Sequence, residues 1–326
     1  MKALILAAGK GTRLKPVTDK ICKPLLPLRG KPTILYILNE LEKINIKEVG
    51  IVVSQENHDE ILDFMRNEFK NNFKFHLIIQ KEQLGVAHAV QSAQSFIGKD
   101  NFLLYLGDNL FEFGLSQVYQ EFKKNNATTI ALKQVKDASR FGVAIINGGN
   151  LVMKIVEKPK NPPSKYAVTG IYCFTNEIFK SIEKINLSQR GEYEITDAIQ
   201  SLILEGKKVY SKIIDGWWID TGNLNDFLKA NREIYTNTSS NRSNFSGSGL
   251  DKTVFIGANV NIKQSKINDF SSIGSNSIIE NSSINNSVVM EGSVLKNVNI
   301  VNCIIGPNSK IINIEPQMKK IESEII

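Results

Sequence analysis

Residues able to bind a polyphosphate lie together near the start of the chain. Gly9 and Gly11 follow an apolar run from Ala3 to Ala8, and basic side chains gather around them at Lys10, Arg13, Lys15 and Lys23. Glycine lets the backbone approach a ligand closely and exposes its N–H groups. Such groups, together with basic side chains, suit phosphate oxygens. We therefore expect a polyphosphate-binding loop directly after a buried strand.

Two well-known phosphate motifs do not fit this loop. The dinucleotide fingerprint needs a third glycine where this chain has Leu14, and Pro16 opposes a helix starting there. The pattern Gly-x-x-x-x-Gly-Lys-Ser/Thr of the P-loop does not occur anywhere in the sequence.

The loop closely resembles the signature of the sugar-nucleotide pyrophosphorylases. Their pattern Leu-Ala-Ala-Gly-x-Gly-Thr-Arg-Leu-x-Pro-x-Thr, followed by Lys-Pro-Leu-x-Pro, is matched from Leu6 through Pro27. A tight turn with solvated lysines is the alternative interpretation. The resemblance implies that Arg13 lies nearest the leaving pyrophosphate and that Lys23 stabilises the α-phosphate. It also implies nucleotide contacts from Leu6, Ala8, Gly9, Gly11, Thr12 and Arg13.

Two aspartates are candidate metal ligands. Asp108 ends an apolar strand within Leu106-Gly-Asp-Asn109, and Asp220 lies in Trp217-Trp-Ile-Asp-Thr-Gly222. Carboxylates suit Mg²⁺, which also takes oxygens from substrate phosphates. Taken alone, Gly-Asp-Asn is equally a common turn. The family resemblance, rather than the spacing, implies that Asp108 and Asp220 hold one Mg²⁺.

A third motif resembles the family's base-recognition segment. Gln80 is followed five residues later by Gly85-Val-Ala-His-Ala89. A side-chain amide offers both a donor and an acceptor, which suits a pyrimidine edge. The resemblance implies that Gln80 and Gly85 bind the base, and Gln83 is a competing candidate. The segment could instead be a solvated strand end that caps a helix, and His88 could be a packing residue.

Further motifs resemble the family's sugar-phosphate pocket. One of them is Glu157-Lys158-Pro159. The resemblance implies that the glutamate binds sugar hydroxyls and that Lys158 holds the attacking phosphate, although the motif could instead be a solvated strand end. Gly191 to Asp197 resembles a helix entry that orders the site. The resemblance thus implies catalytic roles for Arg13, Lys23 and Lys158, and sugar-phosphate contacts from Asn109, Gly142, Glu157, Lys158, Val168 and Tyr172.

Strand-like and helix-like segments alternate from residue 1 to about 235. Alternation in the first half predicts a parallel sheet covered on both faces, and denser strands in the middle predict an antiparallel portion. We therefore expect an α/β, Rossmann-like nucleotidyltransferase domain with a mixed sheet over residues 1–235. A polar, glycine-bearing stretch over 236–250 predicts a linker.

Beyond the linker, aliphatic residues recur every five or six positions. The series runs through Ile256, Ile262, Ile267, Ile273, Ile279, Ile284, Val289, Val294, Ile300, Ile305 and Ile311. This spacing is typical of a hexapeptide β-helix, although short antiparallel strands are an alternative. We expect a short left-handed β-helix over 251–326. Because its coils contain no histidine, a structural or oligomerising role is favoured over acyl transfer.

Composition limits the remaining classes of function. The formal charge of +7 comes from dispersed basic residues, without the patch expected of a nucleic-acid-binding protein, and suits anionic substrates instead. No apolar stretch is long enough to span a bilayer. The first residues do not resemble a signal peptide, and the three cysteines are far apart. We expect a cytoplasmic homo-oligomer without nucleic-acid or membrane partners.

Together these features predict an enzyme that joins a nucleoside triphosphate to a sugar 1-phosphate. The resemblance is strongest to the long, archaeal type of glucose-1-phosphate thymidylyltransferase, which favours dTTP and glucose 1-phosphate. A uridylyltransferase acting on glucose 1-phosphate or N-acetylglucosamine 1-phosphate is the first alternative. A non-catalytic regulatory subunit of the same fold is the second, and a bifunctional acyltransferase is the third.

Overall fold

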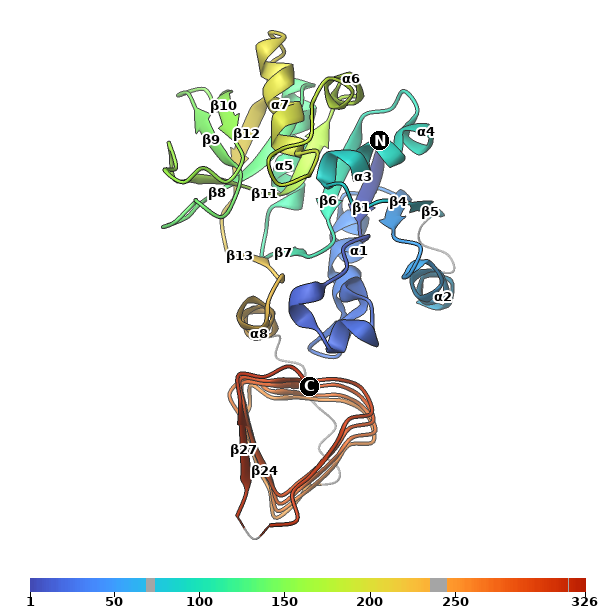
Figure 1. The fold of residues 1–326 in the computed structure, drawn as a ribbon, viewed down its shortest axis with the longest axis vertical. Helices are drawn as coiled ribbons and strands as arrows, with labels where there is room; N and C mark the ends of the chain where they lie inside the picture. The colour runs from blue at the N-terminus through green and yellow to red at the C-terminus, as the bar shows by residue number, and fades with distance from the viewer. Residues whose placement is uncertain (69–73, 235–244, 316) are drawn as a thin grey trace. The chain divides into compact units, whose positions relative to one another are not determined.

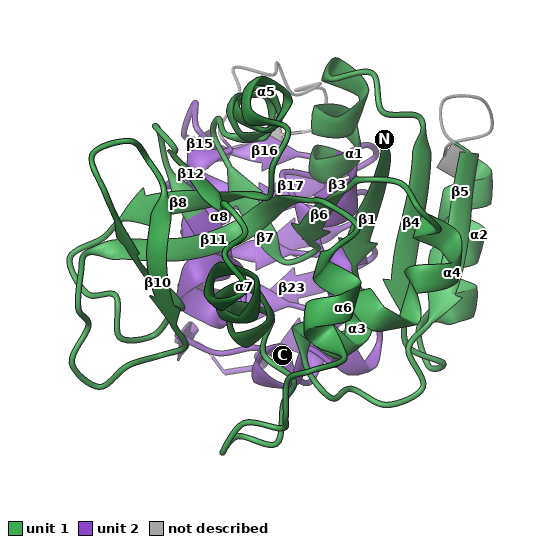
Figure 2. Ribbon diagram, turned by 90° about the horizontal axis from the view of Figure 1, so that it is seen from above, with its two compact units in different colours: residues 1–9, 36–218 green, residues 10–35, 219–326 purple. Residues whose placement is uncertain are grey.

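A computed structural model describes residues 1–68, 74–234, 245–315 and 317–326 (Figure 1). These residues form two compact units (Figure 2). Unit 1 comprises Met1–Gly9 and Tyr36–Trp218, and unit 2 comprises Lys10–Leu35 and Ile219–Ile326. This division by compactness differs from the predicted division at residue 235, because residues 10–35 and the residues from Ile219 onward belong to the same unit.

A mixed sheet forms the centre of unit 1. Its main path runs β10-β9-β11-β6-β1-β4-β5. The parallel part contains β1 (Lys2–Leu6), β4 (Glu48–Val53), β5 (Lys74–Ile79) and β6 (Phe102–Leu106). Apolar residues fill β1, β4 and β6, as expected where both faces of a sheet are covered, whereas β5 at the end of the path is only partly buried.

The remaining strands supply the predicted antiparallel portion. They are β8 (Thr129–Gln134), β9 (Val143–Ile146), β10 (Val152–Val156), β11 (Tyr166–Phe174) and β12 (Tyr210–Ile213). Strand β11 is antiparallel to β6, β8 and β9, while β12 is parallel to β8. The prediction of an α/β fold with a mixed sheet is thus confirmed.

Helices cover this sheet. They are α1 (Thr33–Lys43), which begins in unit 2, α2 (His58–Glu68), α3 (Val86–Ser92), α4 (Gln94–Ile97), α5 (Leu115–Asn125), α6 (Ile178–Ile182) and α7 (Ile195–Leu204). Helices α3 and α4 meet at Ala93. None of the helices in the described ranges is long and apolar enough to cross a membrane.

Unit 2 contains the segment 10–35, which forms tight local turns. Three 3₁₀ helices, η1 (Thr12–Leu14), η2 (Val17–Asp19) and η3 (Lys23–Leu25), precede a hairpin of β2 (Pro27–Leu28) and β3 (Lys31–Pro32). The same unit contains helix α8 (Leu224–Glu233), and β13 (Trp218–Asp220) lies at the boundary of the two units.

The C-terminal strands of unit 2 form three parallel sheets, which Figure 1 shows as the sides of a triangular coil. We call residues 245–326 the three-sided coil. One sheet contains β14 (Phe245–Ser246), β17 (Asn261–Lys263), β20 (Ile278–Glu280), β23 (Val294–Lys296) and β26 (Lys310–Ile312). The second contains β15 (Gly249–Leu250), β18 (Lys266–Asn268), β21 (Ser283–Asn285), β24 (Val298–Val301) and β27 (Lys319–Glu322). The third contains β16 (Phe255–Ile256), β19 (Ser272–Ile273), β22 (Val288–Val289) and β25 (Ile304–Ile305).

Aliphatic residues stack inside the coil, consistent with the expected β-helix. Ile262 pairs with Ile279, which pairs with Leu295. The inward residue in this turn is therefore Leu295, at 0% exposure, and not the expected Val294. Asparagine supplies many corners with positive φ, including Asn276 and Asn302, because its short side chain tolerates that conformation.

The coil also begins earlier than residue 251. Strands β14 and β15 already pair with β17 and β18, and Leu250 packs against the coil's apolar core. The polar composition of this stretch predicted a linker because serine and glycine are typical of linkers, but they also suit the corners of a coil. The earlier part of the expected linker, 235–244, lies outside the described residues.

Candidate functional site

The first part of the predicted phosphate loop lies in unit 1 and is held by a side-chain hydrogen bond to its backbone. Asn57, buried between β4 and α2, donates from Nδ2 to the carbonyl oxygen of Ala7 at 2.8 Å. Leu6 ends β1, and Ala8 is buried. A Cβ at Gly9 would meet no described atom within 4 Å. Protein packing therefore does not require a glycine at this position, and the backbone is open on the side where a ligand is expected.

The second part of the loop, in unit 2, needs a glycine at position 11. Gly11 has a φ of 64°, and its carbonyl oxygen accepts a 2.9 Å hydrogen bond from Thr18 Oγ1. A Cβ there would lie 2.8 Å from Thr18 Cγ2 and 3.4 Å from Lys23 Cβ. The fold thus brings Lys23 beside Gly11, while Thr12 begins the neighbouring η1.

Arg13 and Asp220 converge on Gly222 within unit 2. A Cβ at Gly222 would lie 2.5 Å from Arg13 Nη2 and 3.0 Å from Asp220 Oδ1. A guanidinium and a carboxylate that are far apart in the sequence therefore contact the same glycine. This arrangement joins the residue expected at the pyrophosphate to one expected at the metal.

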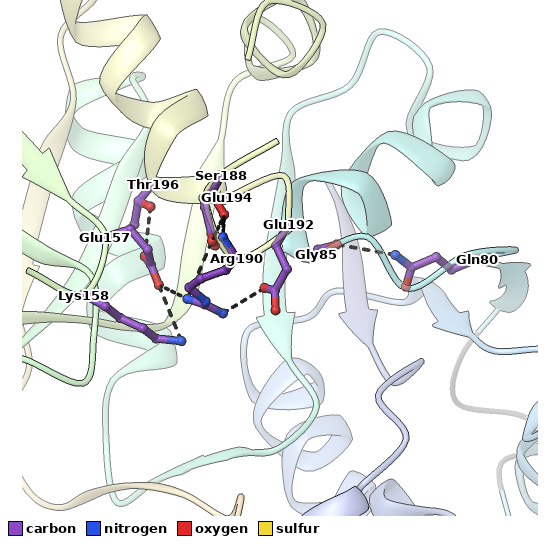
Figure 3. Close-up of polar contacts among 9 residues, drawn as sticks. All are labelled: Gln80, Gly85, Glu157, Lys158, Ser188, Arg190, Glu192, Glu194 and Thr196. Atoms are coloured by element: carbon purple, nitrogen blue, oxygen red, sulfur yellow. Dashed lines mark hydrogen bonds and ion pairs between the residues drawn. The ribbon is translucent and has the colours of Figure 1, made fainter. Parts of the chain in front are cut away.

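The Gln80 amide is buried and held in one orientation. Its Nε2 lies 3.4 Å from the carbonyl oxygen of Gly85 (Figure 3) and 3.1 Å from His88 Nδ1. Since the amide nitrogen can only donate, Nδ1 of His88 accepts, which fixes the ring's tautomer. His88 is thus a partner of Gln80, which the sequence pattern did not predict. The competing Gln83 is exposed.

Asp108 is oriented by its neighbours in unit 1. Asn109 Nδ2 donates to Asp108 Oδ1 at 2.8 Å, and Trp218 Nε1 donates to Asn109 Oδ1 at 2.6 Å. Asn109 is 4% exposed and lies so close to Gly170 that a Cβ there would be 2.6 Å from Asn109 Cγ. Asn109 therefore positions Asp108 directly, besides its expected role in sugar binding.

Glu157 is the centre of a polar cluster at the end of β10 (Figure 3). Thr196 Oγ1 donates to its Oε2 at 2.9 Å, and Lys158 Nζ lies 3.7 Å from its Oε1. A Cβ at Gly142 would lie 2.6 Å from Thr196 Cγ2 and 3.2 Å from Glu157 Oε2. Lys158 has a φ of 37°, a conformation that is costly for lysine and common at functional sites.

Arg190, which the sequence reasoning missed, joins the same cluster. Its guanidinium lies 3.2 Å from Glu157, 3.0 Å from Glu192 and 3.6 Å from Glu194. Burial lowers the pKa of Arg190, but the three carboxylates outweigh burial and raise it overall. Burial raises the pKa of the Glu194 carboxyl, against hydrogen bonding from Ser188. The signal for Arg190 was its position directly before the Gly191–Asp197 motif.

Two predicted sugar-pocket residues lie on the adjacent strand β11. Val168 donates its backbone N–H to the carbonyl oxygen of Gly142 at 2.7 Å, and its side chain is buried. Tyr172 is 3% exposed, and burial followed by the charge of Glu157 raises the pKa of its hydroxyl. Tyr172 is therefore neutral at physiological pH.

One segment connects the base-recognition and sugar motifs. The backbone of Tyr193 donates to Leu84 at 2.7 Å and accepts from Ala87 at 3.1 Å. A Cβ at Gly85, whose φ is 100°, would lie 2.7 Å from the Tyr193 carbonyl oxygen. Figure 3 accordingly shows Gln80 and Glu157 on either side of the chain that carries Arg190 and Glu192.

The chemistry of the donors fits a magnesium ion completed by substrate. Over the described ranges, no group of three or more His, Cys, Asp or Glu residues could hold a metal. Mg²⁺, however, is commonly bound by one or two carboxylates together with substrate phosphates and water. Asp108 and Asp220 supply such oxygens, each beside residues expected to bind phosphate.

Comparison with known proteins identifies relatives of this chain. The family model described as nucleotidyl transferase matches residues 2–237. A glucose-1-phosphate thymidylyltransferase of Streptomyces griseus is 34% identical over 318 residues, covering 91% of this chain and 89% of the relative. A UTP–glucose-1-phosphate uridylyltransferase of Haloferax volcanii is 34% identical over 241 residues, covering 73% and 98%. The solved structure of a putative glucose-1-phosphate thymidylyltransferase from Bacillus anthracis, in complex with sucrose, has a TM-score of 0.67 at 33% identity, covering 74% of this chain and 98% of that one.

Proposed function

Because this chain belongs to the nucleotidyl transferase family, we propose that it joins a pyrimidine nucleoside triphosphate, preferably dTTP, to a hexose 1-phosphate, preferably glucose 1-phosphate. The products are a nucleotide sugar and pyrophosphate. The convergence of Arg13 and Asp220 on Gly222 is the observation that carries this proposal. A binding module has no need of an arginine and an acidic metal ligand at one point.

The chain's own residues perform the transfer by positioning charge. A phosphate oxygen of the sugar 1-phosphate attacks the α-phosphorus in line, and pyrophosphate leaves. Gly9, Gly11 and Arg13 hold the triphosphate, Lys23 stabilises the charge at the α-phosphate, and Lys158 binds the attacking phosphate. No general base is needed, because the attacking phosphate is already ionised.

Asp108 and Asp220 would hold Mg²⁺. When bound, the ion neutralises the repulsion between the two anionic substrates. The hydrogen bonds from Trp218 through Asn109 keep the Asp108 carboxylate aimed before the ion arrives. Such preorganisation lowers the cost of assembling the site.

The sugar and the base are recognised at opposite sides of the group of residues in Figure 3. Glu157, whose Oε1 and Oε2 are held by Arg190 and Thr196, accepts hydrogen bonds from sugar hydroxyls. Gln80 recognises the pyrimidine edge through its Oε1, because Gly85 and His88 take the two N–H donors of its Nε2. The long match to the Streptomyces griseus thymidylyltransferase supports dTTP.

The first alternative, a uridylyltransferase acting on glucose or N-acetylglucosamine 1-phosphate, is supported by the Haloferax volcanii relative. The second, a non-catalytic regulatory subunit, is opposed by the retention of Arg13, Lys23, Asp108, Lys158 and Asp220. Pyrophosphate release, measured for dTTP, UTP, ATP and GTP with each of several sugar 1-phosphates, separates these alternatives. Release only with purine nucleotides would overturn the pyrimidine assignment, and release with none would overturn the activity.

A matched pair of variants tests base recognition. Gln80→Ala should raise the KM for dTTP about tenfold or more, because a base hydrogen bond is lost. The exposed Gln83→Ala is the control and should change the KM less than twofold. The reverse ranking would assign recognition to Gln83.

We further propose that the three-sided coil is a left-handed β-helix that supports a cytoplasmic homo-oligomer without nucleic-acid or membrane partners. Strand β27 is the edge of its sheet, and an edge strand can pair with a second copy. If the β27 strands of two copies paired antiparallel about Ile321, Lys320 of each copy would lie opposite Glu322 of the other. Light scattering should show a dimer that Glu322→Pro dissociates, because the N–H groups of Lys319 and Ser323 bond the neighbouring turn of the coil while that of Glu322 faces the other side of the strand.

A further inference from the structure

We infer that the three-sided coil positions the phosphate-binding segment 10–35, so that residues of the coil and α8 act on nucleotide binding without touching the nucleotide. This inference rests on the proposed function of Gly11, Arg13 and Lys23. It starts from the division of the fold, in which Lys10–Leu35 forms one compact unit with Ile219–Ile326. Contacts within that unit connect the coil to Gly11 in a few steps.

The first connection is the tight turn between β2 and β3. Its two central residues, Arg29 and Gly30, have φ values of 51° and 74°. Positive φ at both positions is the geometry of a type I′ turn, which is costly for arginine. The Arg29 side chain compensates by donating from Nη1 to the carbonyl oxygen of Thr253 at 2.7 Å, with its Cζ 5.9 Å from the centre of the Phe255 ring.

The same ring closes over the glycine of the turn. A Cβ at Gly30 would lie 2.2 Å from Phe255 Cζ. The ring thus occupies the space that a side chain at position 30 would need. Because Phe255 belongs to β16, the turn is packed directly on the first turn of the coil.

The second connection is the amide of Asn231 on α8. This side chain is 2% exposed, and its Oδ1 accepts hydrogen bonds from the Arg29 backbone N–H at 3.1 Å and from Ser272 Oγ at 2.8 Å. Its Nδ2 donates to the carbonyl oxygen of Phe270 at 2.7 Å. One buried amide therefore ties the segment 10–35, α8 and two coil residues together.

The third connection ends at the phosphate-binding glycine itself. Val17 is 1% exposed, and a Cβ at Gly306 of the coil would lie 3.4 Å from Val17 Cγ2. The next residue, Thr18, donates to the carbonyl oxygen of Gly11, and its Cγ2 would lie 2.8 Å from a Cβ at Gly11. Movement of the coil surface at Gly306 is therefore transmitted to Gly11 through two adjacent residues.

Hydrogen exchange tests this inference without requiring activity. In the full-length protein, Phe255→Ala should raise amide exchange within residues 10–35 at least about tenfold, since it empties the space over the turn. Exchange in the strands of unit 1 should stay at the parent's rate. Leu295→Ala is the control, because Leu295 is more deeply buried in the coil than Phe255 but lies in β23, so a general loss of coil stability would be at least as large there. It should leave residues 10–35 unchanged.

Kinetics test the consequence for the reaction. Asn231→Ala and Phe255→Ala should raise the KM for the nucleotide about tenfold while the KM for the sugar phosphate stays within about twofold. If Phe255→Ala does not fold, Phe255→Leu serves with a smaller expected effect in the same direction.

Two results would overturn the inference: unchanged exchange in residues 10–35 for the Phe255 variants, or the same increase for Leu295→Ala. A parent protein that releases no pyrophosphate would instead refute the proposed function, while the exchange data would still decide whether the coil orders the segment.

Discussion

Gly170→Ala provides a sharp test of how Asp108 is positioned. A Cβ at this position would lie 2.6 Å from Asn109 Cγ and 2.8 Å from both Cβ and Oδ1 of the same residue. Ordinary contact begins at 3.4 Å, so Asn109 must retreat by about 0.8 Å. Its bond to Asp108, now 2.8 Å, would then exceed the ~3.2 Å limit of a good N–H···O hydrogen bond.

Two consequences follow from this displacement. Overpacking a buried strand costs about 1–3 kcal/mol of stability, which corresponds to a fall in Tm of roughly 2–12 °C. A catalytic group displaced by nearly 1 Å loses about a hundredfold in rate. We therefore expect kcat/KM to fall about a hundredfold, with a higher Mg²⁺ concentration needed for half-maximal rate.

The assay is pyrophosphate release at varied Mg²⁺ concentration, with circular dichroism to confirm folding. Gly148→Ala is the matched control, because a Cβ there would meet nothing within 4 Å among the described residues, and it should behave as the parent. A folded Gly170→Ala protein with kcat/KM within twofold of the parent, and unchanged Mg²⁺ dependence, would refute the reasoning.

Three further predictions follow from other parts of the structure. Lys23→Ala should lower kcat by about 10²–10³, as for the loss of an oxyanion donor; a loss below tenfold in a pyrophosphate-release assay contradicts its role. Burial first, and the charge of Glu157 second, raise the pKa of Asp197 above 3.8. The folded state then binds more protons than the unfolded state, so stability falls as pH rises from 3.8 through the raised pKa, and Asp197→Asn should flatten that part of the Tm–pH curve; an unaltered slope speaks against it. Cys303 lies one turn of the coil after Ser287, in the same stack of small buried residues, and donates its backbone N–H to Ser287 Oγ at 3.0 Å. Cys303→Ser should therefore shift Tm by less than about 3 °C in calorimetry.

The parts of the fold that depend on local pattern could be predicted from sequence. The apolar run at Ala3–Ala8 gave β1, and the recurrence of aliphatic residues gave the inward positions of the coil, such as Ile262 and Ile284. The spacing of five or six residues was too loose to choose between Val294 and Leu295, because the register is set by pairing with Ile279 on the neighbouring turn.

Contacts between distant segments could not be predicted. Nothing near Arg29 indicates Asn231 or Phe255, more than 200 positions away, yet these residues determine to which unit the segment 10–35 belongs. Likewise, the position of Arg190 before the Gly191–Asp197 motif did not indicate its ion pair with Glu157, which depends on the fold. Motif resemblance named the residues expected to contact substrate, but not the residues that hold them in place.

The most direct test of the central claim follows the α- and γ-phosphorus of dTTP separately, in the presence of glucose 1-phosphate and Mg²⁺. Nucleotidyl transfer predicts that label from the α-position appears in the nucleotide sugar and label from the γ-position in pyrophosphate, in equal amounts. Label from the γ-position in a sugar product, or no transfer of the α-label from any pyrimidine nucleotide to any sugar 1-phosphate, would contradict it.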